Sequence, residues 1–96
     1  MDGIVHIYSH YAHHTDAIIL GDEQGLIALR DAINEAIYPG KRKSEVEVFC
    51  NDGEGYTIKI GCIDKERIDL MPVPYTASYA KDKSQGWLSN PINFLR

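Results

Sequence analysis

The chain has 96 residues, of which 44% are hydrophobic and 25% charged, and its formal net charge at pH 7 is −4. These values are ordinary for a single small globular domain, and the acidic balance argues against a general nucleic-acid binder, whose surface is usually basic. No apolar run approaches the roughly 20 residues of a membrane span. The first residues also lack the basic start and long apolar stretch of a signal peptide, so the expected location is the cytoplasm.

Two short apolar runs at the start of the chain predict a β-hairpin. Residues 3–9, GIVHIYS, are rich in β-branched and aromatic residues. Residues 15–21, TDAIILG, form a second run of strand length that ends at a glycine. The residues between the two runs are few enough for a hairpin loop.

Residues 22–40, DEQGLIALRDAINEAIYPG, carry the strongest helix signal in the chain. Asp22 is a natural N-cap, and the pair Pro39-Gly40 ends the helix. Apolar residues at three- and four-residue spacing predict a buried stripe of Leu26, Leu29, Ile33 and Ile37. A second stripe of small residues would permit close approach to a sheet or another helix: Ala28, Ala32 and Ala36.

A second β-hairpin is predicted from KRKSEVEVFC, NDGEG and YTIKIGCI, which together span residues 41–63. In the register that satisfies both faces, the opposite residues are Cys50 and Tyr56, Val48 and Ile58, Val46 and Ile60, Glu47 and Lys59, and Phe49 and Thr57. Cys50 and Cys62 then share a face but lie about 20 Å apart along the strands. That separation is too great for a disulfide, and free thiols fit a reducing compartment.

From residue 64 onward the periodicity fades, and two prolines, Pro72 and Pro74, favour an extended segment. The end of the chain is nevertheless apolar, and a loose tail is seldom so apolar. Residues 72–96 are therefore expected to dock, either on their own core or on a neighbouring subunit. The side chains expected at such an oligomer interface are Trp87, Leu88, Ile92, Phe94 and Leu95.

The predicted element order is ββαββ, and the predicted fold class is α+β. One amphipathic helix would pack on a small, mainly antiparallel sheet, followed by an extended C-terminal arm. Residues 1–71 would form the core domain and residues 72–96 the arm. A core this small gains from added burial, which favours a homo-oligomer.

Three of the four histidines lie in residues 9–16, SHYAHHTD. His10, His13, His14 and Asp16 offer enough ligand atoms for a metal ion or an acid–base pair. However, the H-E-x-x-H spacing is absent, and adjacent histidines point apart in an extended chain. A polar hairpin loop is the favoured interpretation, and no metal site is assigned. The alternative is a histidine- or metal-dependent phosphoesterase that uses this loop.

Two glycine-containing segments are better explained by structure than by ligand binding. Residues 21–25, GDEQG, would cap a helix, because Asp22 and Glu23 would repel a phosphate at this position. Residues 51–56, NDGEGY, lack the twelve-residue pattern of a calcium loop and are typical of a hairpin turn. No motif in the chain indicates a cofactor.

A basic cluster and an aromatic arm are the remaining candidates for ligand contact. Lys41, Arg42 and Lys43 form either a solvated connection after the helix or an anion-binding rim. Tyr75 and Tyr79 could stack on a base, although packing within the chain is a simpler explanation.

The stretch AIILGDEQGLIALRDAINEAI, residues 17–37, resembles a pattern in small immunity proteins of bacterial polymorphic-toxin systems. In those proteins an apolar strand runs into G-x-x-x-G-L-x-x-L and an amphipathic helix, and here those positions are Gly21, Gly25, Leu26 and Leu29. The short acidic chain also resembles small accessory proteins of phages and prophages. The resemblance implies a protein that binds and neutralises a target without catalysis.

The leading hypothesis is therefore a small non-catalytic binding protein that sequesters or neutralises its target. That target would be a toxin domain, as for an immunity protein, or a small anionic metabolite such as a nucleotide-type immune signal, as for a phage anti-defence sponge. An acidic chain is compatible with masking a basic toxin surface. The residues expected to contact a ligand are His10, His13, His14, Lys41, Arg42, Lys43, Tyr75 and Tyr79.

Overall fold

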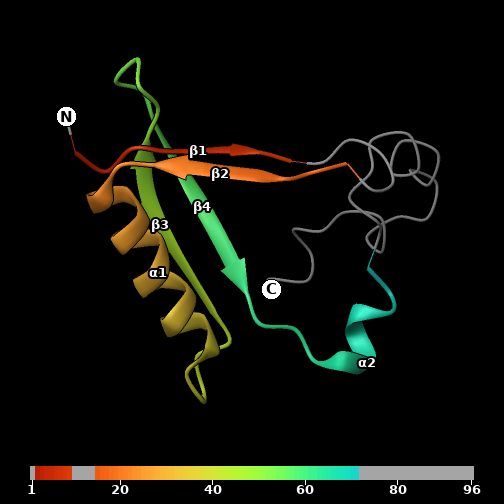
Figure 1. The fold of residues 1–96 in the computed structure, drawn as a ribbon. Coiled ribbons are helices and arrows are strands. Elements are labelled where there is room, and N and C mark those ends of the chain that lie inside the picture. The colour runs from red at the N-terminus through yellow and green to blue at the C-terminus, as the bar shows by residue number, and fades with distance from the viewer. Residues whose placement is uncertain (1, 10–14, 72–96) are drawn as a thin grey trace. The chain divides into compact units, whose positions relative to one another are not determined.

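The computed structural model describes residues 2–9 and 15–71, which fall into two compact units. The described part of the first unit comprises residues 2–8 and 18–62, and that of the second comprises residues 9, 15–17 and 63–71. The elements in chain order are β1 (Val5–Tyr8), β2 (Ile18–Gly21), α1 (Glu23–Ile37), β3 (Lys43–Phe49), β4 (Gly55–Gly61) and α2 (Lys65–Ile68) (Figure 1). The predicted α+β class and the order ββαββ are confirmed.

The hairpin of β3 and β4 has the predicted faces but a different register. Val48 lies opposite Tyr56 and Glu45 opposite Lys59, so every pair is shifted by two residues from the prediction. The tight turn explains the shift, because the Gly53 N–H donates to the Cys50 carbonyl and Gly53 adopts a φ of 91°. A shift of two residues keeps each side chain on its face, which is why the pattern of apolar residues did not distinguish the two registers.

Helix α1 packs against β3 and begins and ends as predicted. The Asp22 side chain accepts a hydrogen bond from the Gly25 N–H at 2.7 Å, and the helix ends at Ile37, before Pro39. The buried face differs from the prediction, since it consists of Gly25, Leu29, Ala32 and Ala36. Three of the four residues of the predicted stripe are exposed: Leu26, Ile33 and Ile37.

Strands β1 and β2 form their own antiparallel sheet, so the described strands make two sheets rather than the single sheet expected. In this hairpin Val5 lies opposite Gly21 and Tyr8 opposite Ile18. One isolated parallel bridge, between Ile4 and Phe49, connects the start of the hairpin to the end of β3. The rest of the β1–β2 hairpin extends beyond that junction (Figure 1).

Two glycines allow the chain before β1 to cross the start of the helix at close range. A Cβ atom on Gly25 would lie 2.2 Å from the Ile4 carbonyl oxygen, and one on Gly21 would lie 2.4 Å from the same atom. Neither distance is possible for a real side chain, so both positions require glycine. The G-x-x-x-G spacing therefore serves strand–helix packing in this fold.

The core of the first unit is small. Val5 and Val48 are fully buried, and Leu29 completes the central cluster. Four partly buried residues of the β3–β4 hairpin pack against this cluster: Val46, Tyr56, Ile58 and Ile60. The core thus joins β1, α1 and the β3–β4 hairpin, and it holds no residue of β2.

In the second unit, the described residues contain the single helical turn α2, which follows Asp64. Across the described segments of both units, we find no helix with the length and apolar character needed to cross a membrane. The proposed C-terminal arm, residues 72–96, lies outside the described residues, as do the five apolar side chains expected at its interface.

Candidate binding surface

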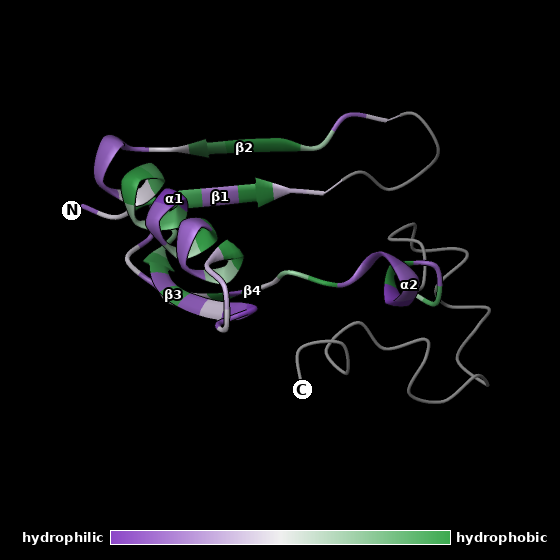
Figure 2. Cartoon of the chain, turned by 90° about the horizontal axis from the view of Figure 1, so that it is seen from below, coloured by the Kyte–Doolittle hydropathy of each residue, from purple (hydrophilic) through white to green (hydrophobic). Residues whose placement is uncertain are grey.

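The β1–β2 hairpin exposes a set of large apolar side chains, here called the hairpin surface. Its five members and their exposed fractions are Ile7 (45%), Tyr8 (52%), Ile18 (48%), Ile19 (52%) and Leu20 (60%). Strand β2 is hydrophobic along most of its length (Figure 2), and all four of its residues are exposed. Large apolar side chains that are exposed together on one short element often mark a contact with another molecule.

Both faces of the hairpin contribute to this surface. Because Ile7 lies opposite Ile19, these two side chains share one face, which also carries the buried Val5. Tyr8 and Ile18 share the other face with Leu20. A two-stranded ribbon is only marginally stable in water by itself, so a ribbon that is apolar on both faces is suited to burial between other elements.

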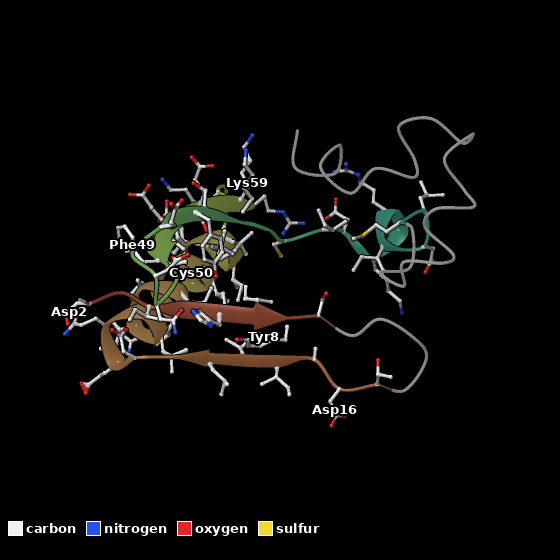
Figure 3. All side chains as sticks on the ribbon, turned by 90° about the horizontal axis from the view of Figure 1, so that it is seen from above. Asp2, Tyr8, Asp16, Phe49, Cys50 and Lys59 are labelled. Carbon is white, nitrogen blue, oxygen red and sulfur yellow. The ribbon has the colours of Figure 1, made fainter. Side chains whose placement is uncertain are left out.

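The hairpin surface is also free of formal charge. Neither β1 nor β2 contains a lysine, arginine, aspartate or glutamate. Apolar side chains project from β2 on the side away from β1 (Figure 3). By contrast, the exposed face of the β3–β4 hairpin carries the opposite residues Glu45 and Lys59, whose charged atoms lie 3.9 Å apart.

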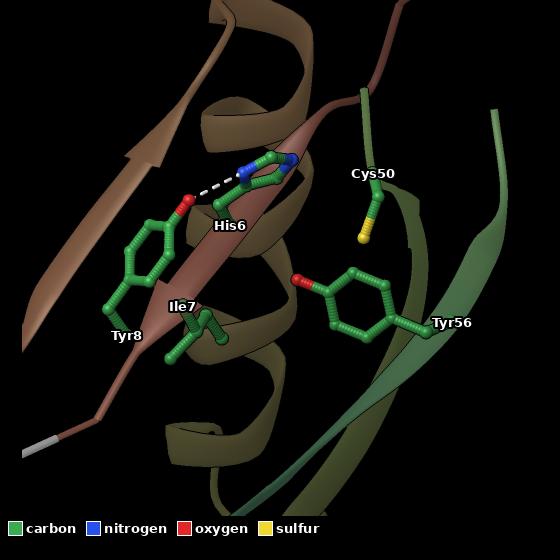
Figure 4. Close-up of a pocket in the computed structure, with 5 residues that line it drawn as sticks. All are labelled: His6, Ile7, Tyr8, Cys50 and Tyr56. Carbon is green, nitrogen blue, oxygen red and sulfur yellow. Dashed lines mark hydrogen bonds between the residues drawn. The ribbon is translucent and has the colours of Figure 1, made fainter. Parts of the chain in front are cut away.

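A shallow pocket of about 300 Å³ adjoins the hairpin surface and shares Ile7 and Tyr8 with it (Figure 4). Its lining residues are His6, Ile7, Tyr8, Cys50 and Tyr56. The Asn51 N–H donates to His6 Nε2 at 3.1 Å, so that nitrogen carries no proton. The proton of the neutral ring is then on Nδ1, which donates to the Tyr8 hydroxyl oxygen at 2.9 Å.

Tyr56 lines the pocket and connects β4 to β1. Its hydroxyl donates to the Val5 carbonyl at 2.5 Å. Burial, reinforced by the nearby Cys50, raises the pKa of the Tyr56 hydroxyl above its ordinary value. The hydroxyl is therefore a neutral donor at physiological pH. Cys50 itself is a free thiol, as is Cys62, in agreement with the prediction that the two do not pair.

Of the predicted ligand-contact residues, the structure describes Lys41, Arg42 and Lys43, and these three do not line the pocket. The basic cluster Lys41–Lys43 lies where the chain enters β3, whereas the pocket lies at the other end of that strand, about 20 Å away at 3.3 Å per residue. Within the basic cluster, Arg42 adopts a φ of 66° and its guanidinium contacts the Cys62 sulfur at 3.8 Å. None of the described residues that line the pocket is a lysine or arginine.

The other predicted site residues lie outside the part of the chain that the structure describes. These are His10, His13, His14, Tyr75 and Tyr79. Among residues 2–9 and 15–71, no group of three or more histidine, cysteine or acidic residues is placed to hold a metal ion. The histidine loop therefore stays a prediction.

Sequence reasoning missed the hairpin surface, although a signal for it was present. Strand patterns that alternate apolar and polar residues indicate a sheet with one wet face. The segment Ile18–Leu20 does not alternate, and it has no charged residue to protect an edge strand. Such a run indicates a strand that is covered on both faces.

Comparison with known proteins returned no match for this chain: no family model, no curated protein and no solved structure is detectably similar. The fold and the surface chemistry therefore carry the functional argument.

Proposed function

We propose that this protein is a small non-catalytic binding protein that neutralises a protein target through the hairpin surface. The observation that carries the proposal is the exposure of five large apolar side chains on a charge-free β1–β2 hairpin. A binding role of this kind is also what the resemblance to immunity proteins implies.

The energy available at the hairpin surface supports this role. Fully burying one large aliphatic side chain is worth about 1.5–3 kcal/mol. Because each of the five side chains is about half exposed, covering all of them would yield about 4–8 kcal/mol. That amount is comparable to the roughly 4–15 kcal/mol that association costs in lost translational and rotational freedom. Burial of the hairpin surface can therefore offset much of the cost of association, and polar contacts with the target would supply the rest.

The chemistry of the surface favours a protein target over a small anionic metabolite. Phosphate groups are bound by arginine, lysine or helix N-termini, and neither strand of the hairpin carries a cationic residue. The nucleotide-type ligand is the alternative target, for which the rings of Tyr8 and Tyr56 beside the pocket offer a stacking surface.

A photo-crosslinking experiment tests the proposal. A photoreactive phenylalanine analogue replaces Tyr8 on the hairpin, and in a matched control it replaces Tyr38, an aromatic residue that is 66% exposed on another part of the same unit. After irradiation in expressing cells, crosslinked proteins are identified by mass spectrometry. The identified partner is then purified and its affinity measured with the wild-type chain and with Tyr8→Asp and Tyr38→Asp.

We expect a specific partner to be crosslinked from position 8 and not from position 38, and Tyr8→Asp to weaken its binding at least tenfold. Equal crosslinking from both positions, or full affinity in Tyr8→Asp, would contradict the proposal. Native mass spectrometry of the purified chain checks the alternative, because release of a nucleotide-like molecule would favour a metabolite as the target.

A further inference from the structure

Three segments of the first unit meet where the β1–β2 hairpin begins: the residues before β1, the start of α1 and the turn between β3 and β4 (Figure 1). The Asp22 carboxylate accepts the Gly3 N–H, which connects the helix start to the residues before β1. The Gly3 carbonyl accepts the Phe49 N–H, and the Asn51 N–H donates to the His6 ring, which connects the turn to both. Side chains on these segments therefore border the hairpin surface.

This bordering region, here called the hairpin base, comprises residues 2–4, 22–26 and 47–55. It contains no lysine or arginine, but it contains six carboxylates. Asp22 is partly buried by its hydrogen bonds. The other five carboxylates belong to exposed residues: Asp2, Glu23, Glu47, Asp52 and Glu54.

The cationic residues of the first unit either pair with an acidic residue or lie at the far end of β3. Arg30 pairs with Asp31 at 3.0 Å, and Lys59 pairs with Glu45 at 3.9 Å. The basic cluster Lys41–Lys43 lies about 20 Å from the hairpin base at 3.3 Å per residue. Charge is thus segregated within the unit, and the apolar hairpin surface begins at the acidic end.

We infer that the target of the hairpin surface is a cationic protein, whose apolar contact patch is bordered by lysine or arginine residues. The apolar patch of the target would cover the hairpin, and its cations would face the carboxylates of the hairpin base. A nucleic acid, an anionic membrane or a second copy of this acidic chain would bring like charges to the same carboxylates, so charge disfavours all three. The inference rests on the proposed function, because it names the chemistry of that target.

The carboxylates supply polar contacts that the hairpin itself cannot make. Strands β1 and β2 hold no charged residue, so the cations of a target have the hairpin base as their nearest partner. Hydrogen bonds between lysine or arginine and a carboxylate are stronger than those between neutral groups. A field of one sign beside the contact surface also speeds the approach of an oppositely charged protein.

Two labelled peptides test the inference by fluorescence anisotropy. One joins a leucine-rich block to a block of lysines, and the other has glutamates in place of the lysines. Each peptide is titrated at low and high salt with the wild-type chain and with three variants. Glu54→Lys reverses a charge at the hairpin base, and Leu20→Ser removes an apolar side chain from the hairpin surface. Glu35→Lys is the matched control, because it makes the same change in net charge at an exposed residue near the end of α1.

We expect the wild-type chain to bind the lysine peptide at least about tenfold more tightly than the glutamate peptide at low salt, and this difference to shrink at high salt, where charges are screened. Glu54→Lys should weaken binding of the lysine peptide at least about threefold, whereas Glu35→Lys should weaken it less. Leu20→Ser should weaken the binding of both peptides. The salt dependence of the wild-type chain needs no variant, so it tests the inference even if a variant does not fold.

Equal affinity for the two peptides, including no measurable binding of either, would overturn the inference. Equal losses in Glu54→Lys and Glu35→Lys would also overturn it, because net charge and not the hairpin base would then explain the preference. So would lysine-peptide binding that Leu20→Ser leaves intact, since the cations would then bind away from the hairpin. Crosslinking from Tyr8 judges the proposed function separately: a crosslinked partner that is acidic at its contact surface would refute the cationic target and leave the proposed function standing.

Discussion

Asp22 and Ile4 are joined in both directions: the Ile4 N–H donates to the Asp22 carboxylate at 2.9 Å, and the Asp22 N–H donates to the Ile4 carbonyl at 3.0 Å. The same carboxylate accepts the N–H groups of Gly3 and Gly25. One side chain thus caps α1 and holds the segment that leads into β1. Because β1 supplies half of the β1–β2 hairpin, Asp22 positions the proposed binding surface as well as the helix.

The first prediction concerns the acid stability of the protein. The Gly25 N–H, together with those of Ile4 and Gly3, holds the pKa of the Asp22 carboxyl below its ordinary value, against a smaller opposing effect of burial. An unfolded aspartate titrates near about 3.9. The stabilisation is therefore complete above that pH and is lost as the pH falls through the lower pKa of the folded state.

Urea unfolding at successive pH values measures this effect. In the wild-type chain the unfolding free energy should decline below about pH 4, and protonation of Asp22 should account for part of that decline. The variant Asp22→Asn should lack this part. Asp31→Asn, at an exposed residue paired with its neighbour Arg30, serves as the control and should follow the wild-type profile. An unchanged profile in Asp22→Asn would show that its hydrogen bonds do not stabilise the fold.

The second prediction concerns the crossing of the chain over the helix start. Gly25→Ala should lower the free energy of unfolding by about 1–3 kcal/mol, because the new methyl group would overlap the Ile4 carbonyl. Alanine is the better helix former by about 1 kcal/mol, so a helix without this contact would be stabilised instead. Thermal unfolding distinguishes the two results, and Gln24→Ala, at an exposed position in the same turn, should be nearly neutral.

The third prediction distinguishes the observed buried face of α1 from the one that periodicity indicates. Leu29→Ala should cost about 2–5 kcal/mol, since Leu29 belongs to the central cluster. Ile33→Ala should cost less, about 1–2 kcal/mol, because Ile33 is 41% exposed and only the buried part of its side chain contributes. Equal losses in chemical denaturation would mean that the periodic stripe is buried after all.

The fourth prediction concerns the link between β4 and β1. Tyr56→Phe leaves the Val5 carbonyl without its donor and should cost about 0.5–1.5 kcal/mol. Tyr8→Phe removes only the exposed contact with His6 and should change stability by less than about 0.5 kcal/mol. If both variants unfold at the wild-type denaturant concentration, the Tyr56 hydroxyl does not hold the two strands together.

The same residue gives an alkaline signature. Burial and the nearby Cys50 raise the pKa of Tyr56 in the folded state, so its contribution to stability is complete below about pH 10, where an unfolded tyrosine titrates. This contribution to stability is lost as the pH rises through the higher pKa that Tyr56 has in the folded state. Tyr56→Phe should remove this part of the alkaline decline in unfolding free energy.

Local interactions explain the parts of the fold that were predictable. The Asp22 cap reaches Gly25 only three residues away, and the turn at Gly53 closes a hairpin between adjacent segments. Interactions between residues only a few positions apart can be predicted from short stretches of sequence. They determined the α+β class, the order of elements, the limits of the helix and the alternation of faces in the β3–β4 hairpin.

Interactions between distant segments decided the rest. If α1 lay on a broad sheet, its periodic apolar stripe would face the core. Instead, the chain at Ile4 crosses close to the helix start, so that Gly25, Ala32 and Ala36 face inward and Ile33 is exposed. The register of the β3–β4 hairpin is a local feature that was nevertheless not predicted, because it depends on turn geometry and a shift of two residues leaves each side chain on its face. Sequence alone therefore gave the candidate strands and their apolar character. Only the tertiary structure showed that β2 lies outside the core and that its apolar side chains are exposed.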